Sequence, residues 1–157
     1  MTPRAAVLVS GGGTNLQAIL DKRGTVIKSG EVALVVSNKP GAFALERAEK
    51  AGIENAYIPY DRKKPEEFEQ ELERLLKLRS IDVIVLAGFL AILSENFVEK
   101  YPKRIINIHP SLIPSFCGKG YYGLKVHEAA LERGVKLTGA TVHFVNGIPD
   151  GGEIIAQ

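Results

Sequence analysis

Short apolar runs alternate along the whole chain with segments that favour a helix. Runs typical of β-strands cover residues 5–10, 31–37, 55–58, 81–87, 105–109, 138–145 and 153–157. Segments that favour a helix cover residues 16–20, 42–51, 66–78, 94–100 and 124–133. Because strands and helices follow one another in this order, the pattern predicts an α/β fold with a parallel sheet, right-handed crossovers and helices on both faces.

The helical segments differ in how clearly they show the face that they bury. The segment over residues 66–78 has a regular apolar stripe opposite a charged, solvent-facing side. In the segment over residues 42–51 the pattern is weaker, and we expect Phe43, Leu45 and Ala48 to face the sheet.

Two polar side chains interrupt the apolar run over residues 105–109. Asn107 and His109 are two residues apart, and side chains alternate between the faces of a strand, so both point the same way. Pro110 cannot continue a central strand, so we expect the strand to end there with His109 at its tip. An amide donor beside a titratable imidazole suits catalysis, although a buried core histidine next to a turn fits the same spacing.

The first strand leads into a glycine-rich loop. Its residues are Gly11, Gly12, Gly13, Thr14 and Asn15. Glycines let backbone N–H groups approach a ligand closely, and the N-terminus of the next helix favours an anion, so the expected ligand is a phosphate. A dinucleotide fingerprint would need a glycine where Leu16 stands, and a Walker loop would need a Gly-Lys-Ser/Thr sequence, which is absent. A tight turn without a ligand is the alternative.

Ligands of open α/β sheets bind at the carboxyl ends of the strands. Gly11–Asn15, Gly88–Leu93 and Asn107–His109 each lie at such an end, so we expect all three along one edge of the sheet. The apolar loop Gly88–Leu93 either lines the site of a flat aromatic ligand or simply plugs the core.

Composition narrows the class of protein. The chain has 157 residues, of which 45% are hydrophobic and 24% charged, and its formal net charge is +2. These values suit one globular domain and leave too little basic excess for nucleic acid binding. Its only cysteine, Cys117, cannot form an internal disulfide, and its histidines lack the spacing of metal ligands, so we expect no metal. Without a membrane span or signal peptide in the pattern, we expect a soluble, cytoplasmic protein.

Four motifs resemble, in the same order, the folate-dependent formyltransferases. Residues 107–114, Asn-Ile-His-Pro-Ser-Leu-Ile-Pro, are similar to the signature of that family, and residues 150–152, Asp-Gly-Gly, match its second motif. Residues 10–17 and 87–94 resemble one branch, the phosphoribosylglycinamide formyltransferases. The resemblance extends to Gln157 and implies a Rossmann-like, mostly parallel sheet with helices on both faces, as a single catalytic domain over residues 1–157.

The resemblance implies transfer of the formyl group of 10-formyltetrahydrofolate to the amine of glycinamide ribonucleotide, in purine synthesis. Asn107 and His109 would flank the formyl carbon, and Asp150 would pair with His109 and favour its charged form. As the amine attacks, the formyl oxygen gains negative charge, which hydrogen-bond donors held in place stabilise. Protonated His109 can also help to deliver a proton toward the leaving folate nitrogen.

The resemblance also implies binding residues and partners. The ribose phosphate would lie on Gly11–Asn15. The residues that it implies for folate binding are Lys64, Phe89, Leu90, Ala91, Ile92, Leu93 and Asn107. Of these, Lys64 would contact the folate tail and residues 89–93 would recognise the pterin through their backbone. The partners would be small molecules only, with no metal, nucleic acid or membrane, and the protein would be a monomer or homodimer.

The chain departs from the family pattern in several places. Ala91 stands where the family often has arginine, Lys64 is the best match for the basic residue that contacts the folate tail, and the loop over residues 115–122 is longer than usual. The family domain continues beyond Gln157, so we expect the natural chain to be longer. Two alternatives stay open: a formyltransferase that acts on methionyl-tRNA, and a truncated paralogue that binds folate or phosphate without catalysis.

Overall fold

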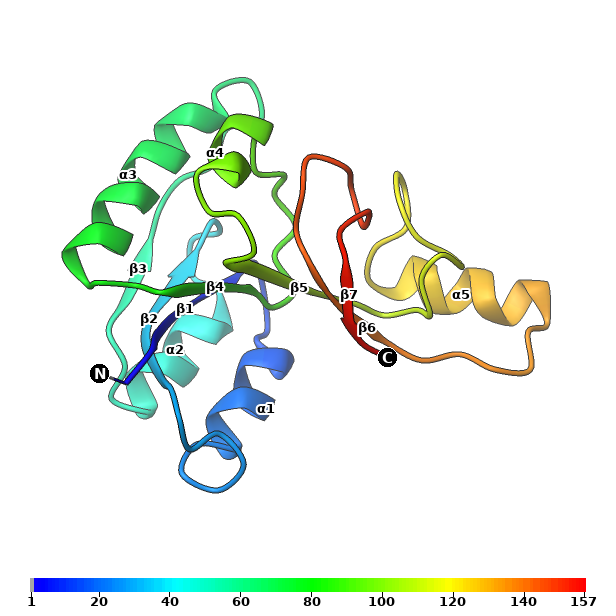
Figure 1. Cartoon of the computed structure of the whole chain (residues 1–157), viewed down its shortest axis with the longest axis horizontal. Coiled ribbons are helices and arrows are strands. Elements are labelled where there is room, and N and C mark those ends of the chain that lie inside the picture. Colours follow the sequence, from blue (N-terminus) through cyan, green and yellow to red (C-terminus); the bar gives the residue numbers. More distant parts are fainter. Residues whose placement is uncertain (1) are drawn as a thin grey trace. The chain divides into compact units, whose positions relative to one another are not determined.

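The first half of the chain alternates strands and helices. The structure, a computed structural model, describes residues 2–157, and its contacts divide the chain into two compact units, of which the first ends at Ser94. The elements of the first unit are β1 (Arg4–Val9), α1 (Thr14–Asp21), β2 (Glu31–Ser37), α2 (Phe43–Lys50), β3 (Asn55–Tyr57), α3 (Pro65–Leu78) and β4 (Val83–Leu86) (Figure 1). Its strands pair in parallel in the order β3-β2-β1-β4, which confirms the predicted elements and their parallel arrangement.

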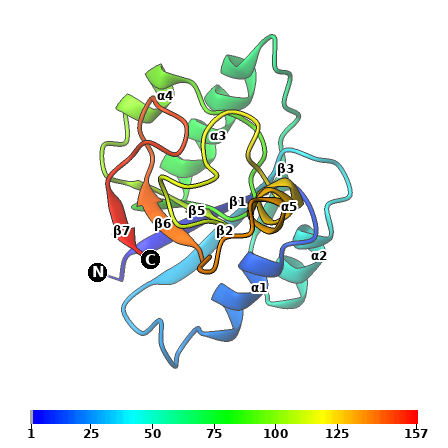
Figure 2. The same cartoon turned by 90° about the vertical axis from the view of Figure 1, so that its right-hand side faces the viewer.

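Helices cover both faces of this parallel sheet. Val7 and Val9 of β1 pack into one cluster with the buried residues of α1 and α2. On the other side of the sheet lies α3, as both views show (Figures 1 and 2). The predicted apolar stripe of α3 is buried and consists of Phe68, Leu72, Leu75 and Leu76. The alternation of side chains along β1 therefore supplies both layers of the core.

The prediction that Phe43 of α2 faces the sheet is wrong. Its side chain is 44% exposed and lies under the guanidinium of Arg47, 4.8 Å from the ring centroid. The predicted Ala48 is fully buried, as is Ala44, and Leu45 packs partly buried against the same core cluster. The helix comes so close to the glycine-rich loop that a Cβ built on Gly13 would lie 2.6 Å from the Cβ of Ala44, so the position of Ala44 takes only a small side chain.

The second unit, Glu95–Gln157, is organised differently. Its elements are α4 (Glu95–Glu99), β5 (Ile105–His109), α5 (Leu124–Arg133), β6 (Thr141–Phe144) and β7 (Ile154–Ala156). The β5–β6 and β6–β7 pairs are both antiparallel, a direction that the apolar pattern of these strands did not reveal. Across residues 2–157, none of the helices combines the length and the hydrophobicity that a membrane crossing needs.

Candidate active site

Two of the three segments predicted at the sheet edge lie together in the first unit. β1 and β4 are parallel neighbours, with Leu8 opposite Leu86, so the loops that follow them begin side by side. These loops are Gly11–Asn15, which we call the glycine loop, and Gly88–Leu93, which we call the apolar loop. The carboxyl edge of the parallel strands therefore brings the two predicted binding loops together.

The glycine loop exposes backbone N–H groups at the start of α1. Gly13 precedes the helix with a φ of 73°, and no side chain caps the first turn or places a carboxylate in it. A helix N-terminus without a side-chain cap keeps N–H groups available for an anion. A Cβ on Gly11 or Gly12 would meet no atom within 4 Å, so the space beside these residues is open to a ligand.

The neighbouring helix α2 holds the glycine loop from behind. Arg47 donates from Nε to the carbonyl oxygen of Gly12 at 2.7 Å and from Nη1 to the side-chain oxygen of Gln17 at 2.9 Å. The N–H of Ala44 donates to the carbonyl oxygen of Gly11 at 3.1 Å. These bonds occupy the loop carbonyls and place a fixed positive charge next to the loop, which favours an anionic ligand.

The apolar loop is anchored at both ends by α3. At its start, the ring of Phe89 stacks on the buried Phe68, with ring centroids 5.8 Å apart. At its end, the buried carboxylate of Glu69 accepts hydrogen bonds from the N–H and the hydroxyl of Ser94, at 2.6 and 2.7 Å. A buried carboxylate that accepts two such bonds is a strong, direction-specific anchor.

Between these anchors the apolar loop presents side chains to solvent and keeps backbone groups free. The hydroxyl of Tyr60 donates to the carbonyl oxygen of Ile92 at 2.9 Å, while the side chains of Leu90 and Ile92 are 61% and 65% exposed. Among the described residues, the N–H of Ile92 and the carbonyl of Leu90 make no hydrogen bond. An anchored loop with free backbone donors and acceptors and apolar side chains suits a flat heteroaromatic ring.

Lys64, the predicted contact of the folate tail, lies in the exposed turn before α3. Its ammonium forms an ion pair with the carboxylate of Glu67 at 3.0 Å, and both side chains are more than half exposed. The hydrogen bond to Glu67 raises the pKa of Lys64. An exposed pair of this kind is weak, so an acidic ligand can displace Glu67 at little cost.

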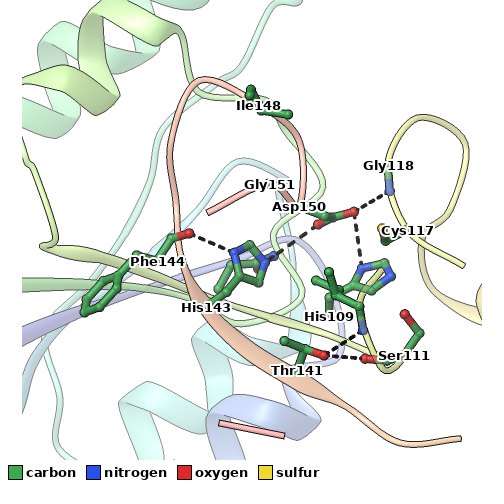
Figure 3. Close-up of polar contacts among 12 residues, drawn as sticks. His109, Ser111, Cys117, Gly118, Thr141, His143, Phe144, Ile148, Asp150 and Gly151 are labelled. Carbon is green, nitrogen blue, oxygen red and sulfur yellow. Dashed lines mark hydrogen bonds and ion pairs between the residues drawn. The ribbon is translucent and has the colours of Figure 1, made fainter. Parts of the chain in front are cut away.

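In the second unit, His109 and His143 both lie next to Asp150, a predicted catalytic residue (Figure 3). Its carboxylate lies 3.5 Å from Nδ1 of His109 and 3.8 Å from Nε2 of His143, and accepts a hydrogen bond from the N–H of Gly118 at 2.8 Å. Asp150 adopts a left-handed backbone with a φ of 54°, which is uncommon for a residue other than glycine. The predicted pairing of Asp150 with His109 is present in the structure.

His109 has an oxygen acceptor at each ring nitrogen. Its side chain is buried, and Nε2 lies 2.8 Å from the carbonyl oxygen of Phe116, which can only accept a hydrogen bond. The carboxylate of Asp150 faces Nδ1 at 3.5 Å. Both ring nitrogens therefore have an oxygen partner, and these contacts fix the orientation of the ring.

His143 is a candidate site residue that sequence reasoning missed, since the sequence pattern indicates only that it occupies an alternating position of a strand. Antiparallel pairing places it directly opposite Asn107. Its Nδ1 lies 2.8 Å from the carbonyl oxygen of Phe144, so Nδ1 carries the hydrogen, and Nε2 accepts from the amide nitrogen of Asn107 at 3.2 Å. This contact fixes which way the Asn107 amide points. Only the register of the two strands, which sequence spacing does not show, could have revealed it.

Close steric contacts explain why glycine stands at both positions after Asp150. A Cβ on Gly152 would lie 1.6 Å from the carbonyl oxygen of Phe144, the same atom that accepts from His143. A Cβ on Gly151 would lie 2.6 Å from a methyl carbon of Ile148. The loop carrying Asp150 therefore folds back onto β6 so tightly that side chains are excluded at both positions.

Cys117 lies in the loop beside Asp150 and donates from Sγ to the carbonyl of Pro114 at 3.3 Å. Burial, and secondarily the charge of Asp150, raises the pKa of its thiol. A raised pKa lowers the thiolate fraction at neutral pH, so this cysteine is a weak nucleophile. Over residues 2–157, no three His, Cys, Asp or Glu side chains are grouped in a way that could hold a metal ion.

The sequence of residues 3–157 matches the formyl transferase family. The chain belongs to this family. A relative from Escherichia coli (strain K12), named phosphoribosylglycinamide formyltransferase, is 46% identical over 154 residues, which are 96% of this chain and 69% of that protein. The resemblance carried by the four motifs is thereby confirmed.

Other relatives in the formyl transferase family are much longer than this chain. The human trifunctional purine biosynthetic protein adenosine-3 is 45% identical over 98% of this chain, which spans 15% of that protein. The Arabidopsis thaliana chloroplastic phosphoribosylglycinamide formyltransferase is 41% identical over 98% of this chain, which spans 53% of its length.

Solved structures agree with the family assignment. Glycinamide ribonucleotide transformylase 1 from Geobacillus kaustophilus superposes with a TM-score of 0.88 at 39% identity, covering 100% of this chain and 81% of its own. A formyltetrahydrofolate deformylase from Pseudomonas syringae superposes with a TM-score of 0.86 at 32% identity, covering 99% of this chain and 50% of its own. The predicted α/β formyltransferase fold is confirmed.

Proposed function

We propose that this chain transfers the formyl group of 10-formyltetrahydrofolate to the amine of glycinamide ribonucleotide. The observation that carries the proposal is the contact of His109 with Asp150, beside an Asn107 amide oriented by His143. A protein that only bound folate or phosphate would need no buried imidazole with an acceptor at each nitrogen. Relatives that carry the name phosphoribosylglycinamide formyltransferase support the choice of substrate.

The ribose phosphate binds on the glycine loop in this proposal. The N–H groups at the start of α1 donate to the phosphate oxygens, and the guanidinium of Arg47 behind the loop adds a favourable charge. The open space beside Gly11 and Gly12 admits the phosphate close to the backbone.

The folate binds on the apolar loop. The exposed side chains of Leu90 and Ile92 contact the face of the pterin, while the free carbonyl of Leu90 and the free N–H of Ile92 pair with its polar edge. Lys64 exchanges Glu67 for a carboxylate of the folate tail. Ala91 places no charge at this loop, so recognition of the ring rests on the backbone and on apolar contact.

The chemical step begins when the substrate amine forms a bond to the formyl carbon, and the formyl oxygen becomes an oxyanion. The N–H of Asn107 that His143 leaves free and the Nε2–H of protonated His109 donate to this oxygen. For that, Nε2 exchanges the carbonyl of Phe116 for the formyl oxygen. The oxyanion then returns to a carbonyl as the bond from carbon to the folate nitrogen breaks. The amine nitrogen loses a proton and the folate nitrogen gains one, while Asp150 holds the His109 ring in place.

A second candidate reaction is hydrolysis of the formyl group. The Pseudomonas syringae protein of the same fold is named a formyltetrahydrofolate deformylase, and water would replace the amine as nucleophile. The glycine loop favours transfer, because hydrolysis needs no site for a ribonucleotide phosphate.

One assay separates these reactions. The protein is mixed with 10-formyltetrahydrofolate, with and without glycinamide ribonucleotide, and free folate, formate and formylated ribonucleotide are measured. We expect tetrahydrofolate to form only when the ribonucleotide is present, with one formylated ribonucleotide for each tetrahydrofolate. The His109→Asn variant should form neither product. Formate without ribonucleotide would favour hydrolysis. No turnover, together with folate binding measured separately by calorimetry, would favour the inactive paralogue. Formylation of methionyl-tRNA, in a parallel reaction that contains it in place of the ribonucleotide, would favour the tRNA branch. A cytoplasmic location and a monomeric or homodimeric state stay predictions.

A further inference from the structure

Ser10 stands between the two binding loops of the first unit. It follows β1 directly and precedes the glycine loop, and its side chain is 9% exposed. Its hydroxyl donates to the side-chain oxygen of Asn38 at 2.6 Å and accepts from the N–H of Leu90 at 2.8 Å. One buried hydroxyl thus joins the ends of β1 and β2 to the middle of the apolar loop.

The hydrogen-bonding capacity of Ser10 is directed away from the glycine loop. Its single hydrogen points to Asn38, whose oxygen can only accept, and a lone pair takes the N–H of Leu90. The hydroxyl therefore has no hydrogen left to donate to a phosphate on that loop. We propose that Ser10 is a positioning residue for folate, which acts by fixing the peptide between Phe89 and Leu90.

The effect of Ser10 on the apolar loop is expected to be local. The loop keeps its anchors to Phe68, Tyr60 and Glu69 when the hydroxyl is removed, so it stays folded. The substitution removes the restraint on Leu90, whose carbonyl and exposed side chain contact the pterin in the proposed function. Restraint of this kind increases affinity because less conformational entropy is lost when the ligand binds.

The assignment rests on the proposed function, and its test compares two buried serines at neighbouring strand ends. Ser10→Ala removes the bond to Leu90. Ser37→Ala is the matched control, because Ser37 is also buried and lies opposite Val9, the residue before Ser10, in the sheet. Its hydroxyl bonds to the backbone of Lys39. Calorimetry with tetrahydrofolate and, separately, with glycinamide ribonucleotide gives the two dissociation constants, and NMR hydrogen exchange reports on the Leu90 amide.

For Ser10→Ala we expect the Kd of tetrahydrofolate to rise roughly fivefold, which corresponds to about 1 kcal/mol. The Kd of the ribonucleotide should stay within about twofold, and the Leu90 amide should exchange faster. Ser37→Ala should change none of the three. Three results would overturn the assignment. A rise in the ribonucleotide Kd alone would make Ser10 a phosphate ligand. Equal rises in the Kd of both ligands, or an unchanged folate Kd together with faster exchange of the Leu90 amide, would also contradict it. Wild-type protein that binds neither ligand would instead refute the proposed function, and this assignment with it.

Discussion

The binding loops of the first unit and the cluster of the second unit use different parts of the chain for chemistry. In the proposed function, backbone N–H and carbonyl groups of the glycine and apolar loops bind the ligands, while side chains such as Arg47 and Glu69 hold the loops from behind. In the cluster, the proposal gives the reaction to side chains, and backbone carbonyls such as that of Phe116 hold them. Substitutions should therefore change affinity in the first region and rate in the second.

The two regions also differ in how their glycines act. Gly11 and Gly12 leave open space that a ligand can enter. Gly151 and Gly152 instead allow one segment to fold tightly onto another, since a Cβ would collide with Ile148 or Phe144. Glycine serves recognition in one region and the placement of a carboxylate in the other.

The largest effect should come from the cluster. His109→Asn and Asp150→Asn should each reduce kcat by roughly 10²–10⁴-fold, because a donor to the oxyanion or the charge that stabilises it is lost. Steady-state kinetics and calorimetry would check this, with the ribonucleotide Kd staying within about twofold.

The double variant sharpens the same test. If His109 and Asp150 act as a unit, the double variant should lose little more activity than the worse single variant. Additive losses in kcat, or a weaker ribonucleotide affinity in either single variant, would show that Asp150 only supports the loop.

A matched pair of glycine variants should separate ligand access from folding in the first unit. Gly13→Ala should lower the free energy of unfolding by at least about 1 kcal/mol, because Gly13 has a φ of 73° and its new Cβ meets Ala44. Gly12→Ala should unfold like the wild type and raise the ribonucleotide Kd roughly tenfold, because its Cβ enters only the space left for the phosphate. Chemical denaturation and calorimetry measure the two effects. A Gly12→Ala variant with wild-type affinity would mean that no phosphate lies on this loop.

A smaller effect should follow from Arg47, which holds the loop from behind. Arg47→Met removes its bond to the Gly12 carbonyl and its charge, so the ribonucleotide Kd should rise roughly three- to tenfold. Lys50→Met is the matched control, because Lys50 also lies over the Phe43 ring, at 5.6 Å, on the exposed side of α2. Calorimetry should show no change for Lys50→Met and none in folate affinity for either variant. Equal losses for the two variants would point to overall charge rather than to support of the loop.

The smallest effect concerns the charge of Asp150, measured without any substrate. Burial and this carboxylate raise the pKa of Cys117, so its alkylation at about pH 8 should be slower than that of a free thiol. Asp150→Asn removes the second cause, lowers the thiol pKa and should speed alkylation about twofold or more. Mass spectrometry of iodoacetamide-treated protein gives the rates. Identical rates would mean that burial alone controls the thiol.

The order of elements and the motifs follow from the amino-acid sequence alone. Apolar periodicity is a local property, so it located the strands and helices closely, from β1 through the helix Leu124–Arg133. Glycine loops and the Asn-x-His-Pro-Ser signature are contiguous, so their residues are sufficient to indicate the formyl transferase family. Helix phase was less secure, because Phe43 follows the apolar pattern yet is excluded from the core by the close approach of Gly13 to Ala44.

Which groups meet depends instead on how the chain packs in three dimensions. Asn107 and His143 are 36 residues apart and become partners only because β5 and β6 pair antiparallel in one register. Ser10 and Leu90 are 80 residues apart, and their hydrogen bond connects the serine before the glycine loop to the apolar loop. Such contacts depend on strand order and register, which arise from packing over the whole unit, and a shift of one residue would turn each side chain to the other face.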